Sequence, residues 1–148
     1  MSHTPNTCPL CLEAGGLLVH QTPQWRLIRV LDDANFPAFY RLIWQGPGTH
    51  IAEFSALSQA ERSACMEAVA TVERVLLEQL RPTKINLASL GNMVPHLHWH
   101  VIARFDWDSH FPNPVWGAAQ REVAGGAEAR LALPLAELDR LLAAAFKS

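Results

Sequence analysis

Three histidines alternate with apolar residues at His96, His98 and His100. Successive side chains of a strand point to opposite faces, so this spacing predicts three neighbouring imidazoles on one face. A single strand histidine is usually a structural residue with polar partners. Three on one face are harder to satisfy, because each buried ring needs a partner and neighbouring cations repel each other. The pattern therefore indicates a functional site.

Two kinds of chemistry suit such a face. Neutral imidazole is a common zinc ligand, which would make the three histidines the centre of a metal-dependent hydrolase. Neutral imidazole is also a good nucleophile near neutral pH, and protonated neighbours can hold the non-bridging oxygens of a phosphate. We favour phosphate chemistry and keep the metal site as the alternative.

Polar residues upstream of the histidines fit the phosphate interpretation. Asn86, Ser89 and Asn92 are expected to add hydrogen bonds at the phosphate or the leaving group. Ordinary turn or strand-end hydrogen bonding is the other explanation for the two asparagines.

A pair of cysteines lies near the N-terminus, with two residues between Cys8 and Cys11. Three cysteines cannot all pair within one chain, and the tight spacing favours metal or redox chemistry over a structural disulfide in a cytosolic protein. Cys65 falls within a helical pattern and is expected to be a small buried hydrophobic residue.

Hydrophobic periodicity predicts four strands and two helices around these residues. The strands are expected at 25–30, 38–44, 84–90 and 97–103, and the helices at 60–80 and 135–146. In the first strand, apolar residues on one side and arginines on the other predict a half-buried strand. Ser58 and Glu61 form a capping-box pattern before the long helix, and Pro82 ends it. Pro134 suits the first turn of the last helix, and the whole pattern indicates an α+β fold.

Size and composition narrow the class of protein. The chain has 148 residues, of which 49% are hydrophobic, so it is long enough for one compact domain. Its net charge of -2 provides no field to draw it onto a nucleic-acid polymer. No apolar run reaches membrane-spanning length, and residues 1–7 lack the pattern of a secretory signal. We therefore expect a single-domain cytoplasmic protein that binds no membrane.

Residues 96–102, His-Leu-His-Trp-His-Val-Ile, match the signature His-φ-His-φ-His-φ-φ, in which φ is apolar, and Arg104 follows. The chain therefore resembles the histidine triad (HIT) family. The resemblance covers about residues 8–104, while the C-terminal extension 105–148 is similar to a bacterial branch related to diadenosine polyphosphate hydrolases. It implies an α+β fold with a five-stranded antiparallel sheet, a long helix and a C-terminal helix. It also implies a homodimer in which the two sheets form one continuous sheet.

The resemblance assigns an activity to the histidines. It makes His98 the nucleophile that becomes nucleotidylated, with His96 and His100 supporting it and the α-phosphate. The implied substrate is a nucleoside phosphate derivative, such as a dinucleoside polyphosphate or a nucleoside phosphoramidate, and no metal is required for catalysis. A nucleotide-binding module with little turnover is a further alternative.

The same resemblance suggests substrate-binding residues outside the triad. Asn92 corresponds to a polar position near the bridging or leaving oxygen, and Asn86 to an asparagine that contacts phosphate or orders a loop. Asp32 lies near a ribose-binding position, within about one residue. Ser89 completes the set of expected substrate-binding residues.

Four residues resemble the zinc ligands of HIT proteins that carry a Cys-x-x-Cys motif and of the galactose-1-phosphate uridylyltransferases. They are Cys8, Cys11, His50 and His96. Two thiolates and two imidazoles fit a closed, tetrahedral structural zinc site, and a pair of reduced thiols is the alternative.

An irregular segment rich in aromatic residues and prolines follows the histidine strand. It contains His110, Phe111, Pro112, Pro114 and Trp116. Proline can hold an extended path without strand partners, so these aromatics either form a wall of the nucleotide pocket or pack on the core.

Overall fold

The computed structural model describes residues 7–45 and 50–147. The segment 1–6, which contributed to the expectation about a secretory signal, lies outside the described residues. Among the helices of the described ranges, none is long and apolar enough to cross a membrane.

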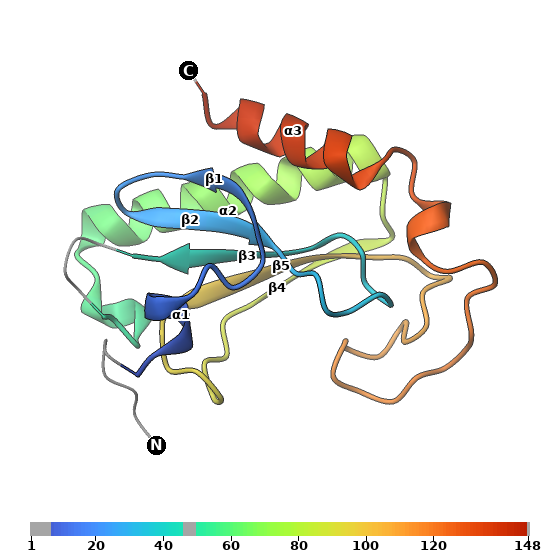
Figure 1. The fold of residues 1–148 in the computed structure, drawn as a ribbon, viewed down its shortest axis with the longest axis horizontal. Coiled ribbons are helices and arrows are strands. Elements are labelled where there is room, and N and C mark those ends of the chain that lie inside the picture. The colour runs from blue at the N-terminus through green and yellow to red at the C-terminus, as the bar shows by residue number, and fades with distance from the viewer. Residues whose placement is uncertain (1–6, 46–49, 148) are drawn as a thin grey trace.

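A five-stranded antiparallel sheet forms the centre of the molecule (Figure 1). Its spatial order is β1-β2-β3-β5-β4, formed by Leu17–Gln21, Trp25–Arg29, Phe39–Trp44, His98–Arg104 and Lys84–Ala88. This confirms the predicted sheet and the four strands expected from periodicity. Periodicity did not predict β1. It is an edge strand whose two leucines, Leu17 and Leu18, are exposed, so its sequence shows no clear alternation of apolar and polar residues.

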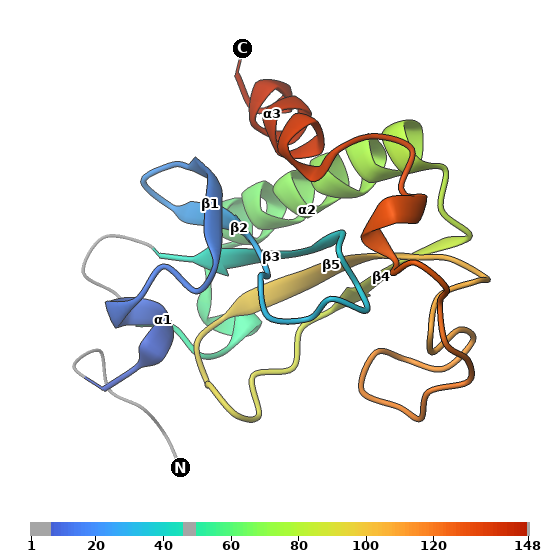
Figure 2. The ribbon, with the colours of Figure 1, turned by 45° about the vertical axis from the view of Figure 1, so that its right-hand side comes forward.

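Two helices cover one face of the sheet (Figure 2). They are α2 (Gln59–Leu80) and α3 (Leu135–Ala145), and both confirm the prediction. The capping box is present, since the Glu61 amide donates to Ser58 Oγ at 3.2 Å and the Ser58 amide donates to Glu61 Oε1 at 2.8 Å. The main core lies between these helices and the sheet.

The ends of the helices differ slightly from expectation. Helix α2 ends on Arg81, which adopts a left-handed conformation with φ 49°, and Pro82 follows. Pro134 is the residue before α3 rather than part of its first turn. Helix α3 is held to the sheet by Asp139, which accepts hydrogen bonds from the Tyr40 hydroxyl at 2.7 Å and from Arg29 Nε at 3.1 Å.

A smaller core occupies the opposite face, where the four-residue helix α1 (Pro9–Leu12) and the connecting loops lie. The prediction that β2 is half-buried is wrong, because Leu27 packs in the main core while Ile28 packs in the smaller one. Arg26 and Arg29 lie three residues apart and therefore point to opposite faces of the strand. Both faces of β2 are covered.

Candidate functional site

His98 and His100 line a cavity of about 300 Å³ on the face of the sheet opposite α2 and α3. The loop that joins β4 to β5 forms one wall, and Arg41 from the neighbouring strand β3 also lines the cavity. Gly91 in this loop has φ 72°, a conformation that side chains with a Cβ rarely adopt. The glycine therefore lets the loop turn beside the histidines.

The hydrogen bonding of His98 determines which of its ring nitrogens is free. His98 Nδ1 lies 2.6 Å from the carbonyl oxygen of His96. A carbonyl oxygen can only accept, so Nδ1 carries the proton and Nε2 keeps its lone pair. Ser89 Oγ donates to the carbonyl oxygen of His98 at 3.0 Å, which fixes the backbone at the start of β5. His98 is therefore held in the tautomer whose Nε2 lone pair is available.

Burial favours the neutral form of both cavity histidines, because it lowers their pKa values. It lowers the pKa of His98, against the opposing effect of the hydrogen bond to His96. Burial, followed by the nearby His98 and Arg41, lowers the pKa of His100 to about 4. We expected a protonated neighbour to hold the phosphate oxygens, but His100 is instead uncharged at neutral pH because its ring is enclosed beside another imidazole and a guanidinium.

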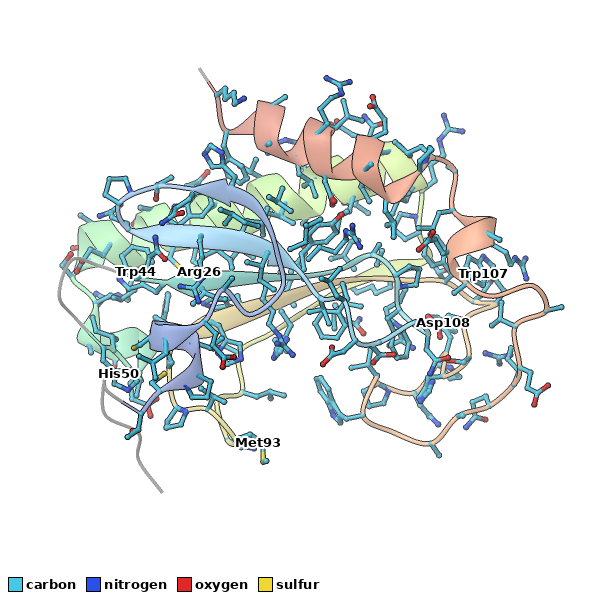
Figure 3. All side chains as sticks on the ribbon, viewed as in Figure 1. Arg26, Trp44, His50, Met93, Trp107 and Asp108 are labelled. Carbon is cyan, nitrogen blue, oxygen red and sulfur yellow. The ribbon has the colours of Figure 1, made fainter. Side chains whose placement is uncertain are left out.

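His96 lies apart from this cavity, in a cluster with two cysteines and His50. Its Nδ1 is 3.4 Å from Cys8 Sγ and 3.3 Å from Cys11 Sγ. Cys11 Sγ is 3.2 Å from His50 Nδ1, and one ligand atom from each of the four residues lies within 4.8 Å of the others. Figure 3 shows His50 close to α1, which carries Cys11. The structure thus assembles the four residues expected to bind zinc.

Three sulfur–nitrogen distances in the cluster, 3.2 to 3.4 Å, are close to those around a tetrahedral metal ion. Zinc bonds of about 2.3 Å to sulfur and 2.0 Å to nitrogen place neighbouring ligand atoms about 3.3 to 3.8 Å apart. His96 Nε2 lies 2.6 Å from the carbonyl oxygen of Trp44, so it carries the proton and leaves the Nδ1 lone pair facing the sulfurs. Burial and the neighbouring Cys8 raise the pKa of the Cys11 thiol to about 11, so a cation would have to displace that proton.

The expected substrate-binding residues lie in different places. Asn92 lines the cavity with His98 and His100, whereas Ser89 bonds to the backbone of His98. Asp32 is exposed and outside the cavity lining, and its carboxylate acts on Arg41, where it raises the pKa against the larger effect of burial. Asn86 lies further along β4, where its Oδ1 accepts a hydrogen bond from Arg104 Nη1 at 2.9 Å.

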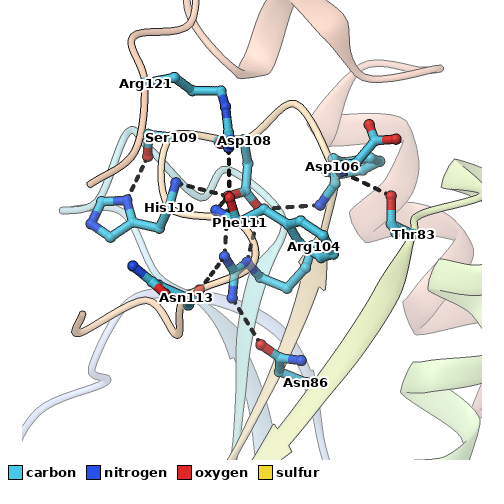
Figure 4. Close-up of polar contacts among 11 residues, drawn as sticks. Thr83, Asn86, Arg104, Asp106, Asp108, Ser109, His110, Phe111, Asn113 and Arg121 are labelled. Atoms are coloured by element: carbon cyan, nitrogen blue, oxygen red, sulfur yellow. Dashed lines mark hydrogen bonds and ion pairs between the residues drawn. The ribbon is translucent and has the colours of Figure 1, made fainter. Parts of the chain in front are cut away.

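The aromatic segment after β5 folds around Asp108 (Figure 4). The Asp108 carboxylate accepts from Arg104 Nε at 2.8 Å and from the backbone amides of Phe105, His110 and Phe111. Trp116 is 58% exposed and lines a separate cavity with Asn86. The segment contributes no residue to the lining of the histidine cavity.

Sequence reasoning missed Arg41 and Arg26. Arg41 pairs with His100 across β3 and β5, and cross-strand partners share a face, but the sequence gives no register between strands. Arg26 is buried, and its Nη2 donates to the carbonyl oxygens of Leu10 and Glu13 at 2.7 and 2.9 Å. An arginine in a strand pattern is normally expected to face solvent. Only the structure shows that Arg26 is buried and hydrogen-bonds the backbone of α1.

Comparison with known proteins gives a consistent result. The family model of the HIT domain matches residues 17–107. No curated protein matches the chain. A solved histidine triad protein from Bradyrhizobium japonicum is 30% identical, with 90% of each chain covered and a TM-score of 0.66. Another, from Marinobacter aquaeolei VT8, is 25% identical, with 90% of this chain and 93% of the other covered and a TM-score of 0.69.

A more distant structure is informative about the fold alone. It is a zinc-bound histidine triad family protein from Mycobacterium smegmatis, 17% identical, with a TM-score of 0.58. The alignment covers 96% of this chain and 94% of that one.

Proposed function

This chain belongs to the HIT domain family, and from that premise we propose that it is a nucleotide hydrolase or nucleotidyl transferase that attacks an α-phosphate. The observation that carries the proposal is His98, whose Nδ1 proton is donated to the carbonyl oxygen of His96 at 2.6 Å. This leaves Nε2 unprotonated at a cavity large enough for part of a nucleotide. Substrates of this class include dinucleoside polyphosphates and nucleoside phosphoramidates.

In the first step, the Nε2 lone pair of His98 forms a bond to the α-phosphorus. The bond from phosphorus to the leaving group breaks, and the leaving group departs with the electron pair and takes up a proton. The imidazole ring gains positive charge as the bond forms, which strengthens the hydrogen bond from Nδ1 to the carbonyl oxygen of His96. That carbonyl therefore stabilises the nucleotidyl-histidine.

In the second step, water or another acceptor attacks phosphorus and the bond to His98 Nε2 breaks. The ring recovers its lone pair, the attacking oxygen loses a proton to solvent, and the nucleoside monophosphate or its ester is released. Asn92, which lines the cavity, would hydrogen-bond the phosphate or the leaving group. Two in-line displacements would retain configuration at phosphorus.

The decisive experiment compares wild-type protein with His98→Asn in a turnover screen across both substrate classes. We expect His98→Asn to lose at least about a thousandfold in kcat while still binding AMP, because it loses the attacking atom but few binding contacts. Intact-mass analysis after acid-free quenching should find a nucleotidyl adduct on the wild-type chain only. The control is His20→Asn. His20 lies in β1, far from the triad in sequence, and its ring stacks on Phe146. Near-wild-type turnover in His98→Asn would sink the mechanism.

The two alternatives predict other outcomes. A metal-dependent hydrolase would use His96, His98 and His100 as ligands, yet the group of potential ligands found among residues 7–45 and 50–147 contains only His96 of the three. A binding module with little turnover would retain nucleotide but form no adduct. The same mass analysis therefore separates it from the covalent mechanism.

We further propose that Cys8, Cys11, His50 and His96 hold one structural zinc ion. The support is the distances among the four ligand atoms together with the proton of His96 Nε2, which is directed at Trp44. The ion would tie the N-terminal segment to the start of β5 and supply no reagent to the reaction.

Elemental analysis of the purified full-length chain should find about one zinc per chain. Removal of the ion should lower the melting temperature, because metal binding contributes to the free energy of folding. Cys11→Ser should lose most of the zinc, whereas Cys65→Ser, which changes a buried cysteine outside the cluster, should keep it. If metal-free protein has the same melting temperature, the cysteines act only in packing and the zinc proposal is wrong.

A further inference from the structure

Arg41, which is half-buried on β3, differs from Arg26 and Arg104, the arginines buried in the two neighbouring strands. Arg26 makes hydrogen bonds through Nε, Nη1 and Nη2, and so does Arg104. Arg41 makes no hydrogen bond and no ion pair within the part of the chain that the structure describes, and its Nε is buried without a partner. A guanidinium has five donors, so this group is left with its hydrogen-bonding capacity unused.

The Arg41 guanidinium lies at the proposed reaction site, where its unused hydrogen-bond donors could contact a substrate. Arg41 is the cross-strand partner of His100, and its side chain lines the cavity that also contains His98. The guanidinium stacks over the Phe39 ring at 5.5 Å, which restricts its orientation without occupying its donors.

Arg41 also dominates the charge of the cavity. The other lining residues are the two histidines, Asn92 and apolar or glycine residues, so Arg41 is the one permanently charged residue in the lining described. The acid that acts on it electrostatically, Asp32, does not line the cavity. A nucleotide brings at least one negative charge into this space, and a half-buried guanidinium is the protein group best suited to a phosphate.

We propose that Arg41 is a further substrate-binding residue, whose guanidinium binds phosphate oxygens of the nucleotide and selects nucleotides over nucleosides. The inference rests on the proposed function, because it takes the cavity to be the nucleotide site. Arg41 would add a permanent positive charge to a site whose signature supplies only histidines as polar residues. Arg41 is therefore a binding residue for the anion, and His98 remains the nucleophile.

The test compares the binding of AMP and adenosine to full-length protein by calorimetry, with GMP and guanosine as a second pair. Arg41→Met removes the charge and keeps much of the side-chain length, Arg41→Lys keeps the charge without the planar fork, and Arg74→Met removes one exposed positive charge from α2 as the control. Melting curves establish that each variant is folded.

We expect Arg41→Met to weaken AMP binding about 10- to 100-fold and to leave adenosine binding within about twofold, since a hydrogen-bonded charge pair contributes that much. Arg41→Lys should fall between Arg41→Met and wild type. Arg74→Met should bind both ligands as wild type does.

Three results would overturn the inference. Unchanged AMP binding in Arg41→Met would show that the guanidinium contacts no phosphate. An equal loss of AMP and adenosine binding would place Arg41 against the nucleoside instead. If neither monophosphate binds wild-type protein, the nucleotide site fails altogether. If the His98 adduct forms normally but AMP affinity is unchanged in Arg41→Met, this inference is rejected and the proposed function is retained.

Discussion

His100 is a buried histidine whose surroundings disfavour its charged form. The residue is 7% exposed, and its ring contacts the rings of Phe39 and His98 and lies near Arg41. Burial first, and then His98 and Arg41, lower its pKa from 6.5 to about 4. The unfolded chain therefore takes up a proton at higher pH than the folded chain does, so acid favours unfolding through this residue between pH 6.5 and pH 4.

We predict that His100→Gln reduces the dependence of stability on pH. Between pH 7.5 and pH 5, wild-type protein should lose about 2 kcal/mol more unfolding free energy than the variant, because only wild type carries this titrating ring. Urea unfolding at the two pH values measures the difference. Parallel losses in the two proteins would mean that His100 titrates normally in the fold.

At the scale of secondary structure, β2 supports two different elements with two arginines. Arg26 holds α1 through the backbone oxygens of Leu10 and Glu13, and Arg29 holds α3 through Asp139. The two faces of one strand thus stabilise the proposed zinc cluster and the C-terminal helix separately.

We predict that Arg26→Met accelerates zinc release to a chelating indicator by about tenfold or more, because loss of groups that orient metal ligands typically weakens a site to that extent. Arg29→Met is the matched change on the same strand. It should lower the melting temperature through the loss of the Asp139 contact and leave the rate of zinc release unchanged. Equal acceleration in both variants would show a general loosening of the fold instead.

Periodicity and capping are enough to predict the elements that carry the site, but not how they meet. The alternation at His96, His98 and His100 predicts a strand with a functional face, and β5 carries two of them. His96 precedes the strand and turns to the cysteines, because its ring has the Trp44 carbonyl as a partner on one side and thiols on the other. Such long-range partners leave no trace in local spacing.

Asn86 is a second residue whose contacts could not be predicted from local sequence. It lies on the expected strand, yet its side chain is engaged by Arg104, within a network that includes Asp108 in the aromatic segment. Neither the ion pair between Arg104 and Asp108 nor the register that sets Arg41 beside His100 follows from composition or periodicity. Both depend on which strands become neighbours.

For the molecule as a whole, β4 leaves one edge of the sheet open. Leu87 on this strand is 44% exposed, and it lines one cavity with Trp116, which is 58% exposed. An edge strand with exposed apolar side chains favours pairing with another chain. The expected homodimer would use this edge.

We predict a mass near twice the 16.4 kDa of the monomer by light scattering at micromolar concentration. Leu87→Glu should shift the protein toward the monomer, because it introduces a charge at the edge of β4. Leu18→Glu changes a leucine of similar exposure on the opposite edge strand, β1, and should leave the dimer intact. A dimer that tolerates Leu87→Glu and is lost in Leu18→Glu would move the interface to β1.

A single residue, His96, links the proposed zinc cluster to His98, the proposed nucleophile. Its imidazole faces Cys8 and Cys11, while its carbonyl oxygen accepts the Nδ1 proton of His98. Stripping the ion would free the imidazole, and the carbonyl that sets the tautomer of His98 would lose its fixed orientation. A chelator would then inhibit the proposed reaction slowly, at the pace of a local rearrangement and without competing with substrate, although the proposed bond-making steps involve no metal.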